Sequence, residues 1–318
     1  MRIVFRADAS NEIGAGHVMR CSAIIEEAVS RNIECVVVGT LGNLKWLETR
    51  LKTIGALHFE NQDNFEITKG EDILIIDSYN LPIDEGFIQE KNWRFVVSVV
   101  DDVTPNYNAT LLIHPGIDSI PLHQNNTSVI TGKDYVPFRK SIVKSKNTIK
   151  GHVENIIVFG GGSDKHNFAC AMAQGLANMP GFDRAVFFSD LQKEIESADS
   201  RFEVKFFGTH LDTELDNADL VFTTASTSSL EIIAREIPLG ICCVADNQKS
   251  YFDALTDLGI AAGIGEYSFS GEWELNWVMI NKLIRDSSFR RKITKNSKGY
   301  FDLFGSQRIV DRILGLLN

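Results

Sequence analysis

Short, continuously apolar runs recur along the chain and are separated by segments of helical period. In the first half these runs predict strands at residues 3–5, 35–38, 73–76, 95–100 and 110–113. Runs that are apolar at every position, rather than alternating, are typical of strands covered on both faces, as in parallel sheets. Residues 17–31 and 44–54 have the spacing of amphipathic helices between such strands.

The second half repeats the same order of elements. Strands are predicted at 156–159, 185–188, 205–207, 220–223 and 239–244, and helices at 168–177, 229–235, 251–258 and 273–285. Alternating strands and helices imply parallel sheets with right-handed crossovers. The polar stretch 143–152 predicts a boundary between a domain at 1–145 and a domain at 146–318. We therefore expect an α/β protein with two Rossmann-like doubly wound domains in tandem, whose ligand sites face an interdomain cleft.

Composition narrows the range of functions. The net charge of −10 argues against a nucleic-acid partner, because such proteins carry a basic surface. No apolar run approaches the ~20 residues needed to span a bilayer, and the first residues lack the apolar core of a secretory signal. Five cysteines without a C-x-x-C pair indicate reduced thiols, without a zinc site or other metal site. These features predict a cytoplasmic protein with no membrane span.

The segment 6–20 follows the first strand and opens the first helix. Gly14 and Gly16 allow a tight turn and a close approach of the backbone to an anionic ligand. A dinucleotide fingerprint would need a third glycine at Met19, so that interpretation is disfavoured. His17 stands at the start of the helix, where a neutral imidazole can act as general base, unless it merely packs or caps. Asp8, Ser10 and Arg20 crowd the same segment, which favours catalysis. We expect Arg20, with Gly14 and Gly16, to contact the substrate.

Further polar residues follow the next strands. Asp77 and Tyr79 end one strand and Asp101–Asp102 end the next, where ligands of parallel sheets lie. The hydroxyl of Tyr79 could hold substrate or water, and a carboxylate could orient His17. The alternative is that Asp77 and Asp102 cap helices or turns.

The second half has two candidate anion sites and one candidate sugar site. The glycine-rich turn contains Gly161, Gly162 and Ser163, and it lacks the lysine of a P-loop. A second turn offers Ser226, Thr227 and Ser228 to a diphosphate, with Glu231 for ribose hydroxyls. The structural alternatives are a tight turn and a helix cap with an acidic first turn. Asn247 and Gln248, after the next strand, could bond a sugar.

These segments together resemble a known family. The pattern Arg-x-Asp-x-Ser-x-x-Ile-Gly-x-Gly-His-x-x-Arg at 6–20 precedes Asp77-x-Tyr79, Gly132-x-x-Tyr135-x-x-x-Arg139, Gly161-Gly-Ser-Asp164, the hydroxyl turn with Glu231, and Asn247-Gln248. This order resembles the UDP-2,4-diacetamido-2,4,6-trideoxy-β-L-altropyranose hydrolases of pseudaminic acid biosynthesis and their spore-coat polysaccharide relatives. The first motif is the specific one, whereas glycosyltransferases share the others more widely.

The resemblance implies a glycosyltransferase-B-like fold that binds UDP mainly through the C-terminal domain. It also implies cleavage of the anomeric C–O bond by water with inversion, without a metal or other cofactor, with His17 as base and Tyr79 and Asn247 in the sugar pocket. The sequence departs from the family's pattern at two places, which bear on the identity of the sugar more than on the nucleotide. The residues before Glu231 lack the family's glycine, and Lys140-Ser141 stand where the family has an acidic and an aromatic residue.

We therefore expect a UDP-sugar hydrolase whose catalytic residues are His17, Asp8 and Tyr79. Two alternatives remain open at this point. One is a glycosyltransferase that uses a UDP-sugar donor and a sugar or lipid acceptor. The other is a non-catalytic protein that binds a nucleotide sugar.

Overall fold

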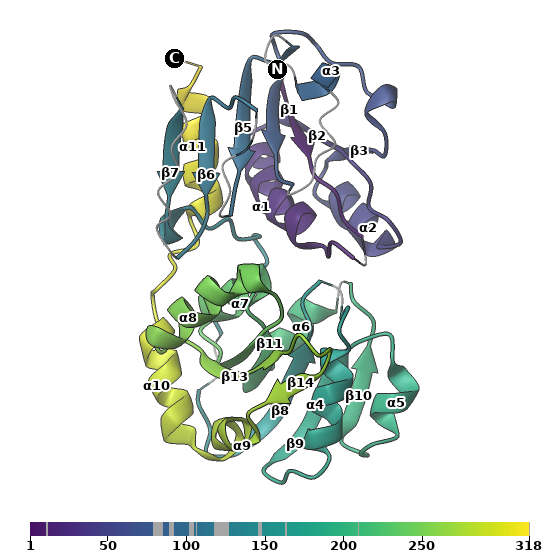
Figure 1. The fold of residues 1–318 in the computed structure, drawn as a ribbon. Helices are drawn as coiled ribbons and strands as arrows, with labels where there is room; N and C mark the ends of the chain where they lie inside the picture. Colours follow the sequence, from purple (N-terminus) through teal and green to yellow (C-terminus); the bar gives the residue numbers. More distant parts are fainter. Residues whose placement is uncertain are drawn as a thin grey trace. The chain divides into compact units, whose positions relative to one another are not determined.

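The computed structural model describes the chain except for residues 11, 79–84, 89–91, 102–104, 106, 118–126, 146–147, 163, 209 and 318, and the side chains of residues 85, 86 and 247. The chain forms two compact units (Figure 1). The first contains Met1–Lys140 and Asp302–Asn318, and the second contains Ser141–Phe301.

The first unit is built on a parallel sheet of seven strands in the order β3-β2-β1-β4-β5-β6-β7. Its strands are β1 (Arg2–Arg6), β2 (Glu34–Val38), β3 (Leu57–Phe59), β4 (Ile73–Ile76), β5 (Phe95–Val99), β6 (Leu111–His114) and β7 (Ser128–Thr131). Its helices are α1 (Gly16–Ser30), α2 (Lys45–Thr53), α3 (Glu85–Ile88) and α11 (Gly305–Gly315), with short 3₁₀ turns η1 (Gln62–Asn64) and η3 (Lys133–Tyr135).

The second unit repeats this plan, in the order β10-β9-β8-β11-β12-β13-β14, with only β14 antiparallel among the described strands. Its strands are β8 (Val153–Phe159), β9 (Phe182–Phe188), β10 (Phe202–Lys205), β11 (Leu220–Thr224), β12 (Leu239–Cys243), β13 (Ala262–Tyr267) and β14 (Trp273–Leu275). Its helices are α4 (Phe168–Leu176), α5 (Gln192–Glu196), α6 (Leu211–Leu215), α7 (Thr227–Ala234), α8 (Lys249–Asp257), α9 (Trp277–Arg285) and α10 (Ser287–Ser297), with the 3₁₀ turn η4 (Asp246–Gln248).

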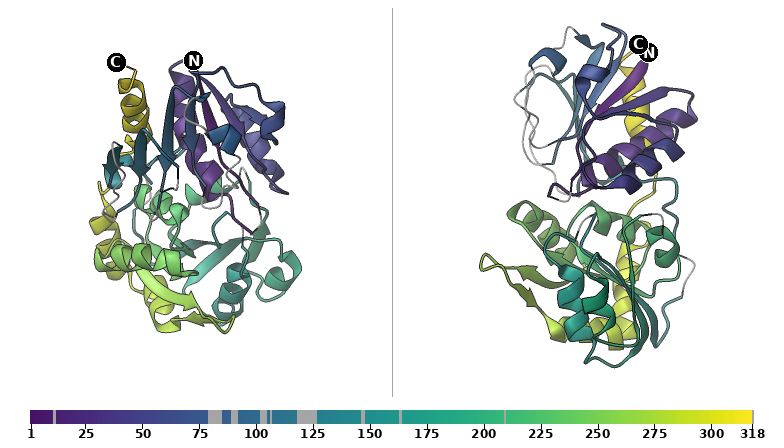
Figure 2. Two further views of the ribbon diagram at one scale, coloured as in Figure 1. Left: turned by 45° about the horizontal axis from the view of Figure 1, so that its top comes forward. Right: turned by 90° about the vertical axis from the view of Figure 1, so that its right-hand side faces the viewer.

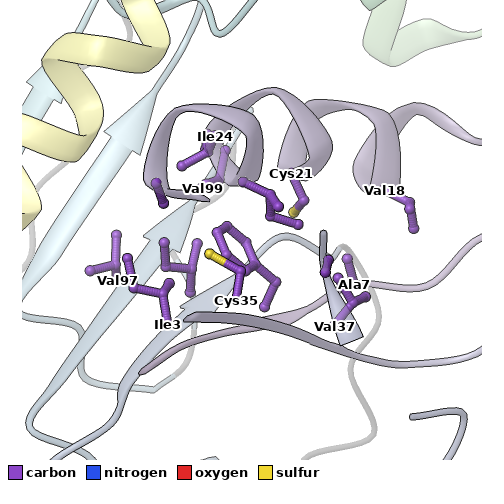
Figure 3. Packing of buried hydrophobic residues seen from close by; sticks show 14 of the residues in the cluster. Ile3, Ala7, Val18, Cys21, Ile24, Cys35, Val37, Val97 and Val99 are labelled. Atoms are coloured by element: carbon purple, nitrogen blue, oxygen red, sulfur yellow. The ribbon is translucent and has the colours of Figure 1, made fainter. Parts of the chain in front are cut away.

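The apolar runs of the first sheet are buried on both faces. Ile3 and Phe5 point to the layer that contains α1, α2 and α11, whereas Val4 points to the layer that contains α3. Figure 3 shows α1 lying over this sheet, with Val18, Cys21 and Ile24 directed to the strands. Side chains alternate between the faces of a strand, so a strand with helices on both sides is apolar at every position. The predicted class, two doubly wound α/β units of Rossmann type, is confirmed.

The C-terminal segment differs from the expected division at residue 145. Helix α11 belongs to the first unit and lies beside its sheet (Figures 1 and 2). Its buried face, with Ile309, Val310 and Ile313, joins the core beneath α1. The helix begins so close to η3 that a Cβ on Gly305 would lie 1.9 Å from the Val136 carbonyl oxygen. The segment therefore completes the hydrophobic core of the first unit.

Two predicted elements of the second unit are corrected. The helix was expected to begin at residue 273, but residues 273–275 form strand β14. Helix α9 begins at Trp277, because the side chain of Asn276 caps it by accepting a hydrogen bond from the Met279 amide at 3.0 Å. The strand expected at 205–207 is instead β10, which ends at Lys205, and Phe206 beyond it is exposed. None of the helices in the described parts of the chain has the length and apolar character needed to cross a membrane.

Candidate functional site

Both sheets reverse their strand order at one point. In the first unit the two neighbouring strands at this point are β1 and β4, and in the second they are β8 and β11. Chains leaving the carboxyl ends of such strand pairs diverge and leave room for a ligand. The segments that follow these four strands contain most of the residues selected from the sequence. Each unit thus has its own candidate site, built from loops at the carboxyl edge of its sheet.

The loop after β1 is a compact turn that leads into α1. The Ser10 hydroxyl accepts from the amides of Glu12 and Ile13, and the Gly14 amide donates to the Ser10 carbonyl at 2.7 Å. Gly14 has φ +85°, a conformation that glycine adopts without strain. Asp8 fixes the base of the loop, because its Oδ1 accepts from Arg6 at 2.7 Å and from the Thr40 amide at 2.9 Å. Asp8 thus ties the start of this loop to the side chain of Arg6 and to the segment after β2.

Helix α1 starts at Gly16 without a side-chain cap. A Cβ on Gly16 would meet no atom of the described chain within 4 Å, so the start of the helix is open on that side. His17 is the second residue of the helix, and its ring is largely buried, with 7% of the residue exposed. Its Nδ1 lies 2.6 Å from Oδ1 of Asp77, which directly follows β4. The sequence suggested that a carboxylate could orient His17, and the structure identifies Asp77.

This contact determines which ring nitrogen is available for chemistry. When Nδ1 carries the proton and donates a hydrogen bond to the carboxylate, Nε2 is the basic nitrogen of the neutral imidazole. A carboxylate hydrogen-bonded to Nδ1 also stabilises the imidazolium that forms when Nε2 takes a proton. The contact with Asp77 therefore fixes the orientation of the ring and leaves Nε2 as its basic atom.

Arg20 lies one turn further along α1 and also bonds to Asp77. Its Nε and Nη2 donate to the two oxygens of Asp77 at 2.7 Å each, and its Nη1 donates to Oδ1 of Asp101 at 2.5 Å. Arg20 was expected to contact substrate, but its guanidinium is buried against these two carboxylates. The sequence named Asp101 only as the end of a strand. Its part in the network depends on the pairing of β4 with β5, which brings Asp77 and Asp101 to neighbouring strand ends.

Burial and charge act in opposite directions on this network. Burial raises the pKa of Asp77, but the charges of Arg20 and His17 and their hydrogen bonds outweigh it, so its pKa lies below the usual value. Burial lowers the pKa of Arg20, but Asp101 and Asp77 together raise it well above the usual value. Both groups are therefore charged at neutral pH. Cys21, whose Sγ lies 3.8 Å from Asp77, has a pKa raised by burial and stays a thiol.

In the second unit the glycine turn after β8 lies against the hydroxyl turn after β11. A Cβ on Gly161, which has φ +101°, would lie 3.6 Å from the Thr224 hydroxyl and 3.9 Å from the Ser226 hydroxyl. Gly162 is partly exposed beside it. The neighbouring helix α4 already has an anionic cap, because Asp164 accepts from the amides of Phe168 and Ala169 at 2.8 and 3.0 Å. Those two amides are thus unavailable to a phosphate.

The start of α7 differs from the start of α4. Its N-cap, Ser226, makes no side-chain capping bond, and Thr227 and Ser228 are partly exposed in the first turn. The Ser229 hydroxyl is buried and donates to the Ser226 carbonyl at 2.7 Å, which holds the turn closed. Glu231 lies one turn into the helix and is half-buried. Of the two turns, the one at α7 leaves more donors available to an anion.

The remaining predicted residues have a mixed outcome. Gln248 lies in η4, and its side-chain oxygen accepts from the Val244 amide at 3.1 Å, so it supports the turn after β12. Asn247 lies in the same turn, but its side chain is outside the described part of the structure. Tyr79, Asp102 and Ser163 also fall outside the described residues. Among the described residues, no group of three or more His, Cys, Asp or Glu side chains is arranged to hold a metal ion.

Comparison with known proteins gives the fold more clearly than the family. No protein-family model matches the chain. An uncharacterized protein of Methanocaldococcus jannaschii is 23% identical over 285 residues, which cover 80% of this chain and 58% of that protein. The chain therefore spans little more than half the length of this relative.

Solved structures match over almost the whole chain. MurG of Acinetobacter baumannii has a TM-score of 0.60 at 12% identity, covering 99% of this chain and 100% of its own. A calicheamicin glycosyltransferase has a TM-score of 0.61 at 14% identity, covering 100% and 98%. The UDP-GlcNAc 2-epimerase of Neisseria meningitidis, solved with UDP-GlcNAc bound, has a TM-score of 0.60 at 11% identity, covering 99% and 100%. The fold is glycosyltransferase-B-like.

Proposed function

We propose that this protein hydrolyses a UDP-linked 2,4-diacetamido-2,4,6-trideoxy sugar to UDP and free sugar with inversion, as in pseudaminic acid biosynthesis. The observation that carries the proposal is the oriented base: His17 at the open start of α1, with Nδ1 2.6 Å from the buried Asp77. The resemblance of the segment 6–20 to the hydrolase family supplies the substrate class. The structural likeness to a UDP-GlcNAc-bound epimerase and to glycosyltransferases supports a nucleotide-sugar ligand.

In the proposed reaction Nε2 of His17 takes a proton from a water molecule as its oxygen attacks the anomeric carbon. The new C–O bond forms as the bond from that carbon to the β-phosphate oxygen breaks. The electron pair of the broken bond leaves with UDP, and attack from the opposite face inverts the anomeric centre. UDP is a leaving group of low basicity, so it needs charge stabilisation more than a strong general acid.

The second unit is proposed to hold UDP. The first turn of α7 supplies amides and the hydroxyls of Ser226, Thr227 and Ser228 for the diphosphate, and Glu231 accepts from the ribose hydroxyls. Gly161 and Gly162 let the neighbouring turn approach the same group without side chains in the way. Asp8, Gly14 and Gly16 shape the loop that presents His17, and Tyr79, Asn247 and Gln248 are proposed to contact the sugar.

A His17→Asn variant tests the role of the base. General-base catalysis typically contributes 10²–10⁴-fold, so we expect kcat to fall by about that factor while UDP affinity stays near wild type. The matched control is His152→Asn, which removes a histidine paired with a carboxylate (Asp183, 2.7 Å) on the surface of the other unit. Turnover by His17→Asn at the rate of this control would leave His17 without a catalytic role.

Assays with and without an added acceptor distinguish the hydrolase from the alternative, a glycosyltransferase. A hydrolase releases free sugar from the UDP-sugar and water alone, whereas a transferase needs an added sugar or lipid acceptor for comparable turnover. A protein that binds UDP tightly but releases no sugar under either condition would instead fit a non-catalytic binding role.

A further inference from the structure

Two stretches of chain connect the units, and both are bonded to the end of the same helix. The second unit begins with residues 141–145 and ends with residues 299–301, which we call the entering segment and the leaving segment. Helix α7 starts at the hydroxyl turn proposed to hold the diphosphate, and Arg235 and Glu236 follow its last residue. Between them, these two residues bond to both segments.

Arg235 holds the entering segment. The residue is buried, with 1% exposed, and its guanidinium donates to Asp212 and Asp216 at 2.7 Å each. The same guanidinium donates to the Ser141 carbonyl at 3.3 Å, and the Ser145 amide donates to the Arg235 carbonyl at 2.8 Å. Because several acceptors fix the orientation of the planar guanidinium, the entering segment is held against the end of α7 at two points.

Glu236 bonds to both segments through one carboxylate oxygen. Its Oε1 accepts from Nζ of Lys144 at 2.8 Å and from the Gly299 amide at 3.1 Å. Its backbone has φ +62°, a left-handed conformation that residues other than glycine seldom adopt. Such a conformation persists where the surrounding contacts hold it. The junction of α7 with the two segments is therefore a fixed point of the second unit.

In the first unit the chain is bonded to helix α1, which starts beside His17. The amide of Lys140, the residue before the entering segment, donates to Glu26 of α1 at 2.7 Å. Lys140 and Ser141 are consecutive residues, so α1 and α7 are bonded to neighbouring positions of the chain. Each of these helices starts at the candidate site of its own unit.

We infer that α7 couples the binding of UDP to the local stability of both connecting segments, with Arg235 and Glu236 as the coupling residues. An anion at the first turn of α7 stabilises the helix, because the amides of that turn gain an acceptor. The helix has eight residues and is only about 12 Å long, so ordering of its first turn restrains the residues after its last turn. The segments bonded to those residues lose freedom with the helix, which couples them to the ligand. This inference rests on the proposed UDP site.

The test is hydrogen exchange measured by mass spectrometry on the full-length protein, with and without saturating UDP. We expect UDP to slow exchange in peptides covering both segments by about 5-fold or more, the lower end of typical coupling between sites. In Glu236→Ala this slowing should be lost in the leaving segment and kept in the entering segment, which Arg235 still holds. A merely structural role of Glu236 would speed exchange equally with and without UDP and would leave the ratio unchanged.

The control variant is Glu203→Ala. Glu203 is also a carboxylate of the second unit that pairs with a lysine (Lys205, 3.2 Å), but it lies on β10. This substitution should leave the UDP-dependent slowing unchanged in both segments. Glu236→Gly, which glycine tolerates at this φ, replaces Glu236→Ala if that variant does not fold. Calorimetry of UDP binding to each protein ensures that exchange is compared at equal occupancy.

The outcomes separate this inference from the proposed function. Wild type that binds UDP without slower exchange in either segment overturns the inference and leaves the UDP site in place. Equal slowing of the leaving segment in wild type and in the Glu236 variant overturns the coupling role of Glu236. Absence of UDP binding to wild type refutes the proposed function, and the inference fails with it.

Discussion

Replacing Asp77 by asparagine removes the charge on which the His17 site is built while keeping the shape of the side chain. Asp77 is fully buried and accepts two bonds of 2.7 Å from Arg20 and one of 2.6 Å from His17. Breaking a buried ion pair by removing one partner costs about 3–5 kcal/mol. Because Asp101 still pairs with Arg20, we expect a loss of unfolding free energy near the lower end, about 3 kcal/mol. Without the carboxylate, Nδ1 of His17 is no longer fixed as the donor, and kcat should fall by about 10²–10⁴.

The assay pairs urea unfolding with the rate of UDP release from the UDP-sugar. The control is Asp72→Asn. Asp72 is also a buried carboxylate paired with an arginine (Arg2, 2.6 Å), but it directly precedes β4, whereas Asp77 directly follows it. Both variants should lose stability, and only Asp77→Asn should lose kcat. Equal kcat values in the two folded variants would refute the claim that Asp77 orients the base.

Three further predictions concern other parts of the chain. Glu231→Ala should weaken UDP binding by about 1–3 kcal/mol, measured by calorimetry, because ribose hydroxyls lose their acceptor; unchanged affinity would remove this role. Burial raises the pKa of Asp164 to about 6 in the folded protein. The folded state therefore binds a proton at Asp164 more tightly than the unfolded state does. This contribution to stability is complete below about pH 4 and is lost as the pH rises through 6. Urea unfolding should therefore show wild type losing up to about 3 kcal/mol relative to Asp164→Asn between pH 4 and 7.5, and parallel pH profiles would contradict this. Gly305→Ala should destabilise the first unit by about 1–3 kcal/mol in thermal unfolding, since its Cβ would lie 1.9 Å from a carbonyl oxygen, whereas Gly315→Ala on the same helix meets no described atom within 4 Å and should not.

The sequence was most informative where local pattern and burial coincide. The run Ile73–Ile76 is buried at every position and forms β4 as predicted, and the glycines around His17 marked the start of α1. It was least informative where structure depends on distant pairing. The bond between Arg20 and Asp101 joins residues 81 positions apart, and no local pattern specifies it. The return of α11 to the first unit likewise depends on its fit against Val136, which the amphipathic period of the helix does not encode.

Short elements at the edges of the sheets were missed for a related reason. Strands β3 and β14 have three residues each, too few for a periodic signal to develop. Trp273 was assigned to a helix from its sequence neighbours, but in the structure its ring packs on Phe168 and its indole donates to the His166 carbonyl at 2.7 Å. Tertiary contacts of this kind override local preference in short segments.

The central claim is that this protein uses His17 to hydrolyse a UDP-sugar. The most direct measurement is proton NMR of the purified protein with UDP-2,4-diacetamido-2,4,6-trideoxy-β-L-altropyranose in water, following the anomeric signals over time. We predict that UDP and free sugar appear together without an acceptor, that the first sugar anomer formed has the inverted configuration, and that His17→Asn slows this release by about 10²–10⁴-fold. An unchanged substrate signal, or release only after an acceptor is added, would contradict the account.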